Sequence, residues 1–307
     1  MEQEILRWIH SECQTSADFI CMGVGDDGAI LNPTGPLVLT TDTIAEGTHF
    51  SRPLMGLANI GRKAMAVNLS DLAAMGAQPR AALITLQLPF ELTFDQVKLL
   101  FLGMKELASE YEVAIVGGDT NRWDGPLTVG ATLIGSHYPS DEGRTGFWSL
   151  GGGRAGDGIW VSGCFGGSIL SHHFQFQPQI HLAAHLVSHH GITAATDASD
   201  SLAHDLSQLA IASQTGFEID SRLIPISEDA VKQSASTGRP ALEHALYDGE
   251  DFQLICCVPA GEEQKIEQDR ELPSPFTRIG RLTETTSFTI INGTGIREPL
   301  IIKGFQH

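Results

Sequence analysis

Five short segments set aspartates beside glycine, threonine or serine, and these residue types could bind metal ions and phosphate. The segments are Gly25-Asp26-Asp27, Thr40-Thr41-Asp42, Asn68-Leu69-Ser70-Asp71, Gly117-Gly118-Asp119-Thr120 and Asp197-Ala198-Ser199-Asp200. Carboxylate and hydroxyl oxygens are the hard ligands that Mg²⁺ prefers. If the carboxylates converge, their mutual repulsion implies several divalent ions, and such a pocket could receive a polyphosphate.

The position of these aspartates along the chain supports a shared role. Taken singly, each is more simply a turn former or a helix N-cap. Several follow strand-like runs, however, and the ends of strands are where a rigid sheet presents chemistry. We therefore expect aspartate-bearing turns at the strand ends that carry Asp26, Asp27, Asp42, Asp119 and Asp197.

Composition limits the classes of function. The chain has 307 residues and a net charge of −18, with 37 acids against 19 lysines and arginines. That balance argues against a nucleic-acid partner, which clustered lysine and arginine would bind. No apolar run is long enough to span a membrane, and the first residues carry no basic, apolar leader. We expect a cytoplasmic protein with reduced thiols, because the five cysteines are scattered and form no C-x-x-C pair.

Periodicity predicts alternating helices and strands in two domains. The predicted helices cover 2–12, 57–75, 93–109, 166–173, 180–190 and 197–213. The predicted strands cover 36–43, 80–89, 113–120, 126–137, 158–162 and 193–196, one after the loop that begins at 245, and two or three within 277–303. The Gly-rich segment 149–157 is the expected boundary between domains 1–150 and 151–307.

The segments that carry these aspartates resemble the thiamine-monophosphate kinase family, within the aminoimidazole ribonucleotide synthase-like superfamily. The resemblance rests on GVGDDGAIL, LTTDTIAEGTHF, NLSDLAAMGA, VAIVGGDTNR, GRAGDGIWVSG, DASDSLAHDL and LYDGEDFQLICCVP, in order from about residue 23 to 259. It implies an α/β (α+β) fold in two domains. An N-terminal mixed sheet with flanking helices would bind metal and ATP and form a homodimer, and a C-terminal α/β domain would complete the site.

The resemblance also implies roles for individual residues. Magnesium ligands would be Asp27, Thr40, Thr41, Asp42, Asp71, Asp119, Asp197 and Asp200. ATP contacts would be Gly118, Asp119, Ser199 and Arg144. Contacts to thiamine monophosphate would be His49, Glu250 and Phe305. The implied reaction transfers phosphate from ATP to thiamine monophosphate. It needs no general base, because the attacking phosphate oxygen is largely deprotonated at pH 7.

Three positions depart from the family pattern. Ser201 replaces a glycine and is expected to crowd the loop before a helix. Asp248 adds an acid near the expected substrate site. Leu150 stands where the family has an ATP-contacting arginine, with Arg144 and Arg154 as displaced candidates.

Other readings stay open. His181, His185 and His189 recur at helical spacing with His172, His173 and His190 nearby, which could bind zinc, although a solvated or packed face is the simpler interpretation. The chain has no P-loop and no protein-kinase signature. The rival functions are another ATP-using enzyme of the superfamily and a non-catalytic nucleotide-binding paralogue.

Overall fold

A computed structural model describes residues 2–13, 18–138 and 146–303 and divides the chain into two compact units. The first unit contains the described residues up to Leu72 together with Gln78–His137. The second contains Ala73–Ala77 and the described residues from Tyr138 onward. The Gly-rich segment 149–157 lies inside the second unit. Among the described residues, every helix is too short or too polar to cross a membrane.

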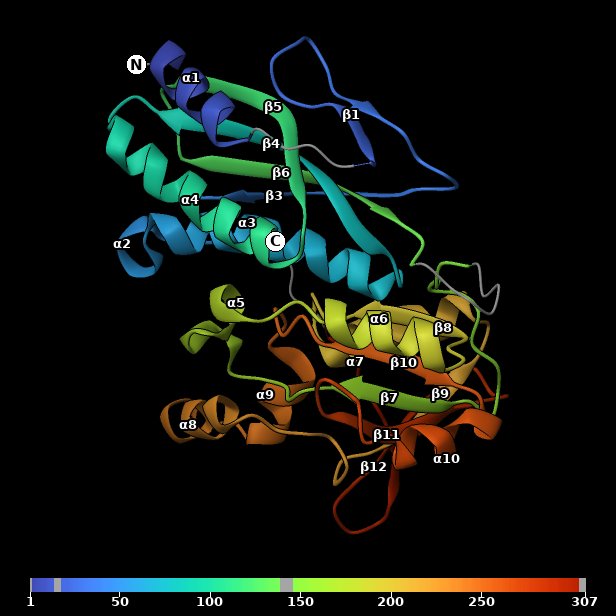
Figure 1. Ribbon diagram of the computed structural model, residues 1–307. Helices are drawn as coiled ribbons and strands as arrows, with labels where there is room; N and C mark the ends of the chain where they lie inside the picture. The colour runs from blue at the N-terminus through green and yellow to red at the C-terminus, as the bar shows by residue number, and fades with distance from the viewer. Residues whose placement is uncertain (1, 14–17, 139–145, 304–307) are drawn as a thin grey trace. The chain divides into compact units, whose positions relative to one another are not determined.

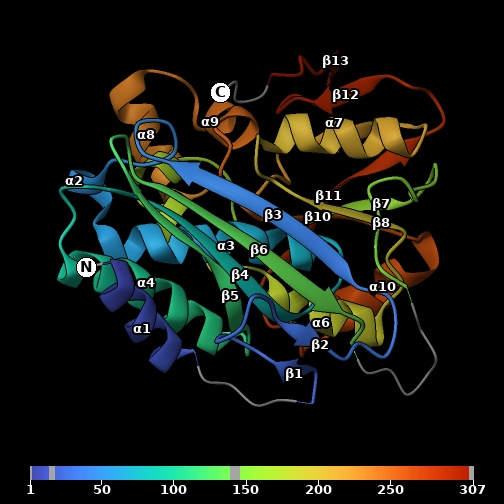
Figure 2. The ribbon, with the colours of Figure 1, turned by 90° about the horizontal axis from the view of Figure 1, so that it is seen from above.

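The first unit is a four-stranded sheet with helices on one face (Figures 1 and 2). Its helices are α1 Glu2–Glu12, α2 Arg52–Met55, α3 Leu57–Ala74 and α4 Phe94–Glu110. Its strands are β1 Ile20–Met22, β2 Ile30–Leu31, β3 Val38–Ala45, β4 Gln78–Pro89, β5 Ala114–Trp123 and β6 Thr128–Ser136. The sheet order is β3-β6-β4-β5, with β4 and β5 parallel and the other pairs antiparallel. The predicted mixed sheet with flanking helices is therefore confirmed.

Side-chain alternation gives this sheet one face that the helices cover and one face that is open except where Phe19 and Ile20 pack on Ala81 and Ile134. In β4, Ile84, Leu86 and Leu88 are buried, whereas Leu83 and Thr85 are exposed. Alternate residues of a strand point to opposite faces, so the covered face is the one that packs on the helices. Figure 2 shows the strands in front of α3.

Two glycines let α3 and α4 cross closely on the covered face. A Cβ atom on Gly61 of α3 would lie 1.9 Å from the Leu100 carbonyl oxygen, and one on Gly103 of α4 would lie 1.9 Å from the Ala58 carbonyl oxygen. Helix separation depends on the side chains at the contact, so these glycines fix the position of α3. Thr93 and Gln96 close a capping box at the start of α4.

The second unit is a seven-stranded mixed sheet with helices on both faces (Figure 1). Its helices are η1 Ser168–Leu170, α5 His172–Gln175, α6 Ile180–His189, α7 Leu202–Ala212, α8 Glu228–Thr237, α9 Ala241–Tyr247 and α10 Ala260–Gln268. Its strands are β7 Gly158–Ser162, β8 Ala194–Asp197, β9 Gly216–Asp220, β10 Leu254–Val258, β11 Phe276–Thr283, β12 Phe288–Ile291 and β13 Arg297–Pro299. The sheet order is β13-β12-β9-β11-β7-β10-β8.

The core of the second unit explains its continuously apolar strands. Ile255 and Cys257 of β10 pack with α7 and α9 in one cluster, while Val258 packs with Ile266 of α10 in another. Both faces of β7 and β10 are thereby buried, which is why neither strand alternates in polarity.

The structure corrects several expected elements. Asp42 and Asp119 lie within β3 and β5 rather than at strand ends, because both strands stay paired beyond the aspartate. The predicted helix 197–213 begins at Leu202, and 166–173 contains only η1 and the start of α5. Helices α8, α9 and α10 were not predicted, because their sequences are short and polar or lie beside a glycine-containing loop.

Candidate functional site

An acidic pair, Asp42 and Asp71, lies in the first unit where β3 meets α3. Thr40 and Asp42 are two residues apart on β3, so their side chains share one face of the strand. The Thr40 hydroxyl donates a hydrogen bond to the Asp71 carboxylate, and the carboxyl groups of Asp42 and Asp71 are hydrogen-bonded to each other. The structure thus brings three of the expected ligands together.

The electrostatics of the acidic pair favour a bound cation. Burial raises the pKa of the Asp42 carboxyl, while the hydrogen bond with Asp71 and the nearby His49 lower that pKa. Two bare carboxylates in contact repel, so the pair needs either a shared proton or a cation. Two carboxylates and a hydroxyl form the hard oxygen set that suits Mg²⁺. Thr40, Asp42 and Asp71 could therefore hold magnesium.

A buried lysine lies on the same helix, two turns before Asp71. Lys63 is fully buried, and its ammonium group donates a hydrogen bond to the His49 carbonyl oxygen at 3.2 Å. His49 is itself oriented, because its Nδ1 accepts the backbone N–H of Ala45 at 3.1 Å. Lysine is almost never fully buried without a partner, so Lys63 is a candidate functional residue. Sequence reasoning missed it, although a lysine within the apolar run of α3 was a visible signal.

Thr41 and Asp119 are not brought to the acidic pair. The Thr41 hydroxyl lies on the opposite face of β3, 2.9 Å from the Thr132 hydroxyl. Asp119 pairs with Thr85 in the sheet register and lies on β5, three strand spacings or about 14 Å from β3. Both residues are exposed. Within one copy of the first unit, Thr41 and Asp119 therefore lie apart from the acidic pair and from each other.

The remaining expected residues of the N-terminal half have simpler positions. Asp27 lies in an exposed turn, where its backbone N–H donates to the Asp26 carboxylate at 2.9 Å. Arg144 lies outside the described residues, as does Phe305 near the C-terminus.

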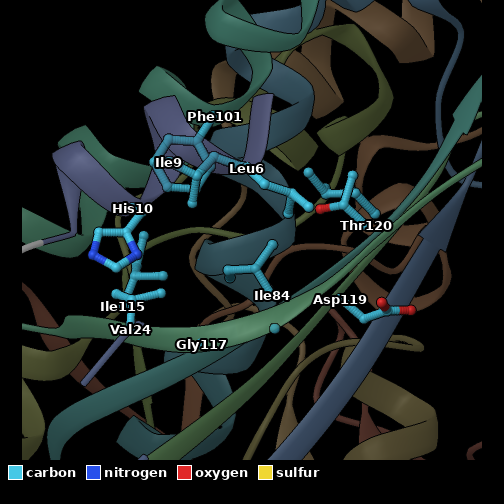
Figure 3. A pocket seen from close by; sticks show the side chains of 12 residues that line it. Leu6, Ile9, His10, Val24, Ile84, Phe101, Ile115, Gly117, Asp119 and Thr120 are labelled. Carbon is cyan, nitrogen blue, oxygen red and sulfur yellow. The ribbon is translucent and has the colours of Figure 1, made fainter. Parts of the chain in front are cut away.

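An apolar cavity of about 170 Å³ lies between α1, α4, β4 and β5 (Figure 3). Leu6 and Phe101 line its apolar wall, and Gly118 and Asp119 also border it. In Figure 3 the Asp119 carboxylate points away from the apolar side chains. A Cβ atom on Gly118, where φ is 149°, would lie 1.8 Å from the Ile84 carbonyl oxygen. An apolar cavity of about 150 Å³ accepts a benzene-sized ring, so this one fits a planar ring.

The expected residues of the second unit gather on two loops that bind each other. Asp197 is the last residue of β8, the loop after it carries Ser199 and Asp200, and the loop before β10 carries Glu250. The Glu250 N–H donates to the Ser199 carbonyl at 2.7 Å, and the Phe252 N–H donates to the Ala198 carbonyl at 2.8 Å. These main-chain bonds place the four side chains in one region of the second unit.

Ser201 does not crowd its loop as expected. It is fully buried and caps α7, because its hydroxyl accepts the His204 N–H at 3.2 Å. The Asp205 carboxylate accepts the N–H groups of Asp200 and Ser201 at 2.9 and 3.0 Å. Burial raises the pKa of the Asp205 carboxyl, although these bonds oppose the rise. Sequence reasoning missed Asp205, which fixes the loop that carries Asp200.

The loop around Glu250 is strained and holds a buried acid. Glu250 and Phe252 have positive φ angles of 53° and 49°, a conformation that non-glycine residues rarely adopt. Glu250 lies 3.4 Å from Nδ1 of His173. Between the two strained residues, Asp251 is 1% exposed and accepts the Gly166 N–H at 2.8 Å. Burial raises the pKa of the Asp251 carboxyl well above its usual value.

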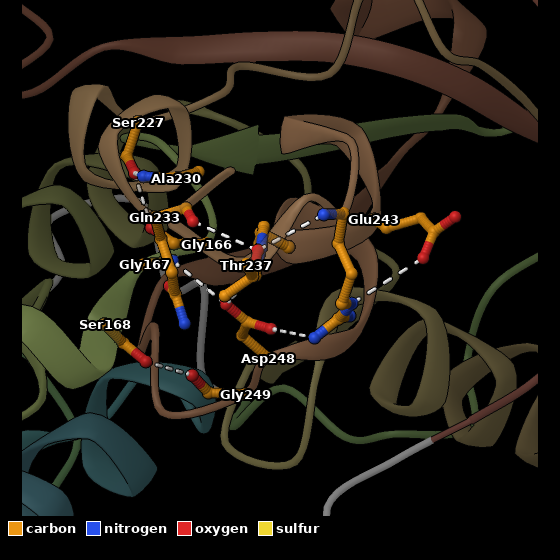
Figure 4. A network of polar contacts seen from close by, with 12 residues as sticks. Gly166, Gly167, Ser168, Ser227, Ala230, Gln233, Thr237, Glu243, Asp248 and Gly249 are labelled. Atoms are coloured by element: carbon orange, nitrogen blue, oxygen red, sulfur yellow. Dashed lines mark hydrogen bonds and ion pairs between the residues drawn. The ribbon is translucent and has the colours of Figure 1, made fainter. Parts of the chain in front are cut away.

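Asp248 serves the fold rather than adding an uncompensated acid (Figure 4). Its carboxylate lies 2.7 Å from Nδ1 of His244 and 3.4 Å from the Arg239 guanidinium. It also accepts the Gly167 N–H at 3.3 Å. The side chain of Asp248 therefore ties α9 to the turn before η1.

The main chains of Leu150 and Arg154 are held by hydrogen bonds within the second unit. Leu150 is 38% exposed, and its carbonyl accepts the Ser213 hydroxyl at 3.4 Å. The Arg154 backbone N–H donates to the Asp157 carboxylate at 2.9 Å. The expected displacement of the family arginine to Arg154 stays a prediction.

Comparison with known proteins identifies relatives along the whole chain. The AIR synthase related protein, N-terminal domain, matches residues 25–137, and the AIR synthase related protein, C-terminal domain, matches residues 131–292. The chain is 37% identical to a thiamine-monophosphate kinase of Rhodopirellula baltica, covering 100% of this chain and 97% of the relative. It is 30% identical to the thiamine-monophosphate kinase of Bacillus subtilis, covering 93% of each.

Solved structures agree with these matches. The crystal structure of thiamine-monophosphate kinase from Stenotrophomonas maltophilia superposes with a TM-score of 0.80 at 30% identity, covering 93% of this chain and 95% of that one. A structure described as AaThiL complexed with AMPPCP and TMP superposes with a TM-score of 0.75 at 27% identity, covering 100% and 96%.

Proposed function

Because the chain belongs to the thiamine-monophosphate kinase family, within the AIR synthase related proteins, we propose that it converts ATP and thiamine monophosphate to ADP and thiamine diphosphate. The observation that carries the proposal is the acidic pair with its Thr40 hydroxyl, a magnesium-type ligand set on a rigid strand and helix. The relative bound to AMPPCP, an ATP analogue, and TMP supports the choice of substrates.

The chain's residues suit a direct in-line transfer. Magnesium, when bound, supplies the positive charge that lets two phosphate groups approach and stabilises the charge that spreads during transfer. Thr40, Asp42 and Asp71 would hold that ion in the first unit, and Asp197 and Asp200 are further expected oxygen ligands, in the second unit. The substrate phosphate has a second pKa of about 6, so its attacking oxygen needs no base. In this proposal the role of the chain's residues is to bind the two substrates and to orient them for transfer.

The apolar cavity provides a place for the base of ATP. It accepts a planar ring, and the glycine-rich turn at its edge lets the backbone approach closely. Gly118 and Asp119 would then face the sugar-phosphate part of the nucleotide. Ser199 in the second unit is a further nucleotide contact in this proposal, and His49 and Glu250 are contacts for thiamine monophosphate.

The open face of the first sheet supports a homodimer. Leu39 is 65% exposed and Leu83 is 37% exposed on that face, which also carries Thr41 and Asp119. Large apolar side chains exposed on one face of a sheet suit an interaction surface. Two copies that pack through this face would bury the leucines, and each copy could bring its Asp119 toward the Thr41 edge of the other.

An ADP-release assay tests the proposed reaction. The full chain is incubated with Mg²⁺ and ATP, with and without thiamine monophosphate, and the thiamine products are separated. We expect ADP and thiamine diphosphate in equal amounts, and only when thiamine monophosphate is present. ATP binding without turnover would favour the nucleotide-binding paralogue, and turnover with a different acceptor would favour another enzyme of the superfamily.

A further inference from the structure

Two histidines and one aspartate of the second unit converge away from the acid loops. His185 lies in α6, His190 is the residue that ends this helix, and Asp269 is the residue that ends α10. Nε2 of His185 and Nε2 of His190 each lie 2.7 Å from the same oxygen, Oδ2 of Asp269. These three atoms lie within 4.8 Å of one another.

The convergence is supported by neighbouring contacts. The other oxygen of Asp269, Oδ1, accepts the Glu271 N–H at 2.8 Å, which aims Oδ2 at the imidazoles. The His189 ring stacks on His185 at 4.4 Å and donates from Nδ1 to the His185 carbonyl at 2.9 Å. The side chains of His185, His190 and Asp269 are 13%, 6% and 14% exposed. Partners that orient a ligand in this way are typical of metal sites.

The electrostatic field around His185, His190 and Asp269 also favours a cation. The C-terminal ends of α6 and α10 meet at this cluster, and helix C-termini carry partial negative charge. A surface cavity of about 320 Å³ is bordered by Trp148, Glu262 and His190 of the cluster. An ion and a solvent ligand could enter by this side.

We propose that His185, His190 and Asp269 bind one zinc-class divalent ion, with solvent as its fourth ligand. Two imidazoles and one carboxylate with an open position form a ligand set that zinc uses in proteins. Imidazole suits zinc rather than magnesium, so this site differs in metal class from the acidic pair. The ion would tie α6 to α10.

The geometry requires only a small adjustment. Zinc bonds of about 2.0–2.1 Å place the ligand atoms of a tetrahedral site about 3.3 Å apart. Each imidazole nitrogen, now 2.7 Å from Oδ2, must therefore withdraw by about 0.6 Å.

Zinc titration of the metal-free full chain tests the site. Calorimetry is run in excess Mg²⁺, which occupies the oxygen-rich sites. We expect one zinc per chain, binding at least tenfold weaker in His185→Gln, and unchanged in His181→Gln, an exposed histidine at the start of α6. Zinc should also raise the melting temperature of the wild type and not that of His185→Gln.

X-ray absorption of the zinc-loaded wild-type chain gives a second test that does not depend on the folding of a variant. Two imidazoles in the first shell are expected. Oxygen-only coordination, no zinc binding in excess Mg²⁺, or equal affinity in wild type and His185→Gln would each overturn the proposal and leave a hydrogen-bonded His-Asp-His cluster.

Discussion

At the scale of single residues, the side chains that we propose bind magnesium and those that hold the fold are both acidic. Asp42 and Asp71 are in contact and need a cation or a proton between them. Asp205 and Asp248 instead accept main-chain N–H groups and bond to histidines. Sequence alone could not separate these roles, because each of the four aspartates has a threonine, serine, glycine or histidine as a neighbour.

Asp251 gives a pH-dependent prediction. Burial raises its folded-state pKa well above the usual value, so the folded chain keeps a proton that the unfolded chain loses. Its contribution to stability is full below the unfolded pKa of about 4 and falls as pH rises toward the folded pKa, by at most about 1.4 kcal/mol per pH unit. Asp251→Asn should therefore gain unfolding free energy relative to wild type between pH 5 and pH 7, measured by urea denaturation. A difference in unfolding free energy between Asp251→Asn and wild type that stays the same from pH 5 to pH 7 would contradict this account. Asp124→Asn, at an exposed position, is the control.

Ser201 gives a prediction about its departure from the family. Its hydroxyl caps α7 by accepting the His204 N–H. Removing a serine N-cap costs about 1 kcal/mol with alanine but only a few tenths with glycine. Urea denaturation should therefore rank wild type and Ser201→Gly close together and Ser201→Ala lower. A stabilised Ser201→Gly variant would instead support the crowding that the sequence suggested.

At the scale of elements, periodicity predicted the apolar helices and strands well and the polar ones poorly. The predicted helix 57–75 is α3 Leu57–Ala74, and the predicted strand 158–162 is β7 Gly158–Ser162. Both have an apolar pattern set by burial. The helix α8 is polar on most sides, and only Ala230 within it is buried. Its sequence therefore has no apolar stripe that would predict a helix.

Strand length decided where the expected ligands lie. Asp42 and Asp119 are inside strands, and pairing across the sheet separates them. Whether a strand continues past an aspartate depends on its neighbours in the sheet, which the local sequence does not encode. The acidic pair could be predicted as a set of residue types, but its separation from Asp119 could not.

The close crossing of α3 and α4 gives a prediction at this scale. A methyl group at Gly103 would meet the Ala58 carbonyl, so Gly103→Ala forces α4 away from α3. Overpacking of this kind costs about 1–3 kcal/mol. We expect thermal and urea denaturation to show that loss. Gly261→Ala, in the open helix α10, is the matched control and should be neutral or stabilising. If Gly103→Ala were as stable as Gly261→Ala, α3 and α4 would not be closely packed where they cross.

At the scale of the whole molecule, the two mixed-sheet units and the match along the full chain place the protein in its family. The open face of the first sheet gives the chain a surface that a second copy could cover. Leu39→Lys, on that face, should convert a dimer into a monomer by analytical ultracentrifugation and lower turnover. Leu54→Lys, on α2 and 86% exposed, is the control. A wild-type monomer, or a Leu39→Lys dimer, would contradict the proposed interface.

The central claim is that the acidic pair holds the magnesium that makes phosphoryl transfer possible. The most direct test compares ADP release from ATP and thiamine monophosphate by wild type, Asp71→Asn and Asp124→Asn across a Mg²⁺ titration. Loss of a metal ligand should lower turnover by about 100-fold or more in Asp71→Asn, with Asp124→Asn unchanged. Wild-type turnover with an unaltered Mg²⁺ dependence in a folded Asp71→Asn would contradict the account.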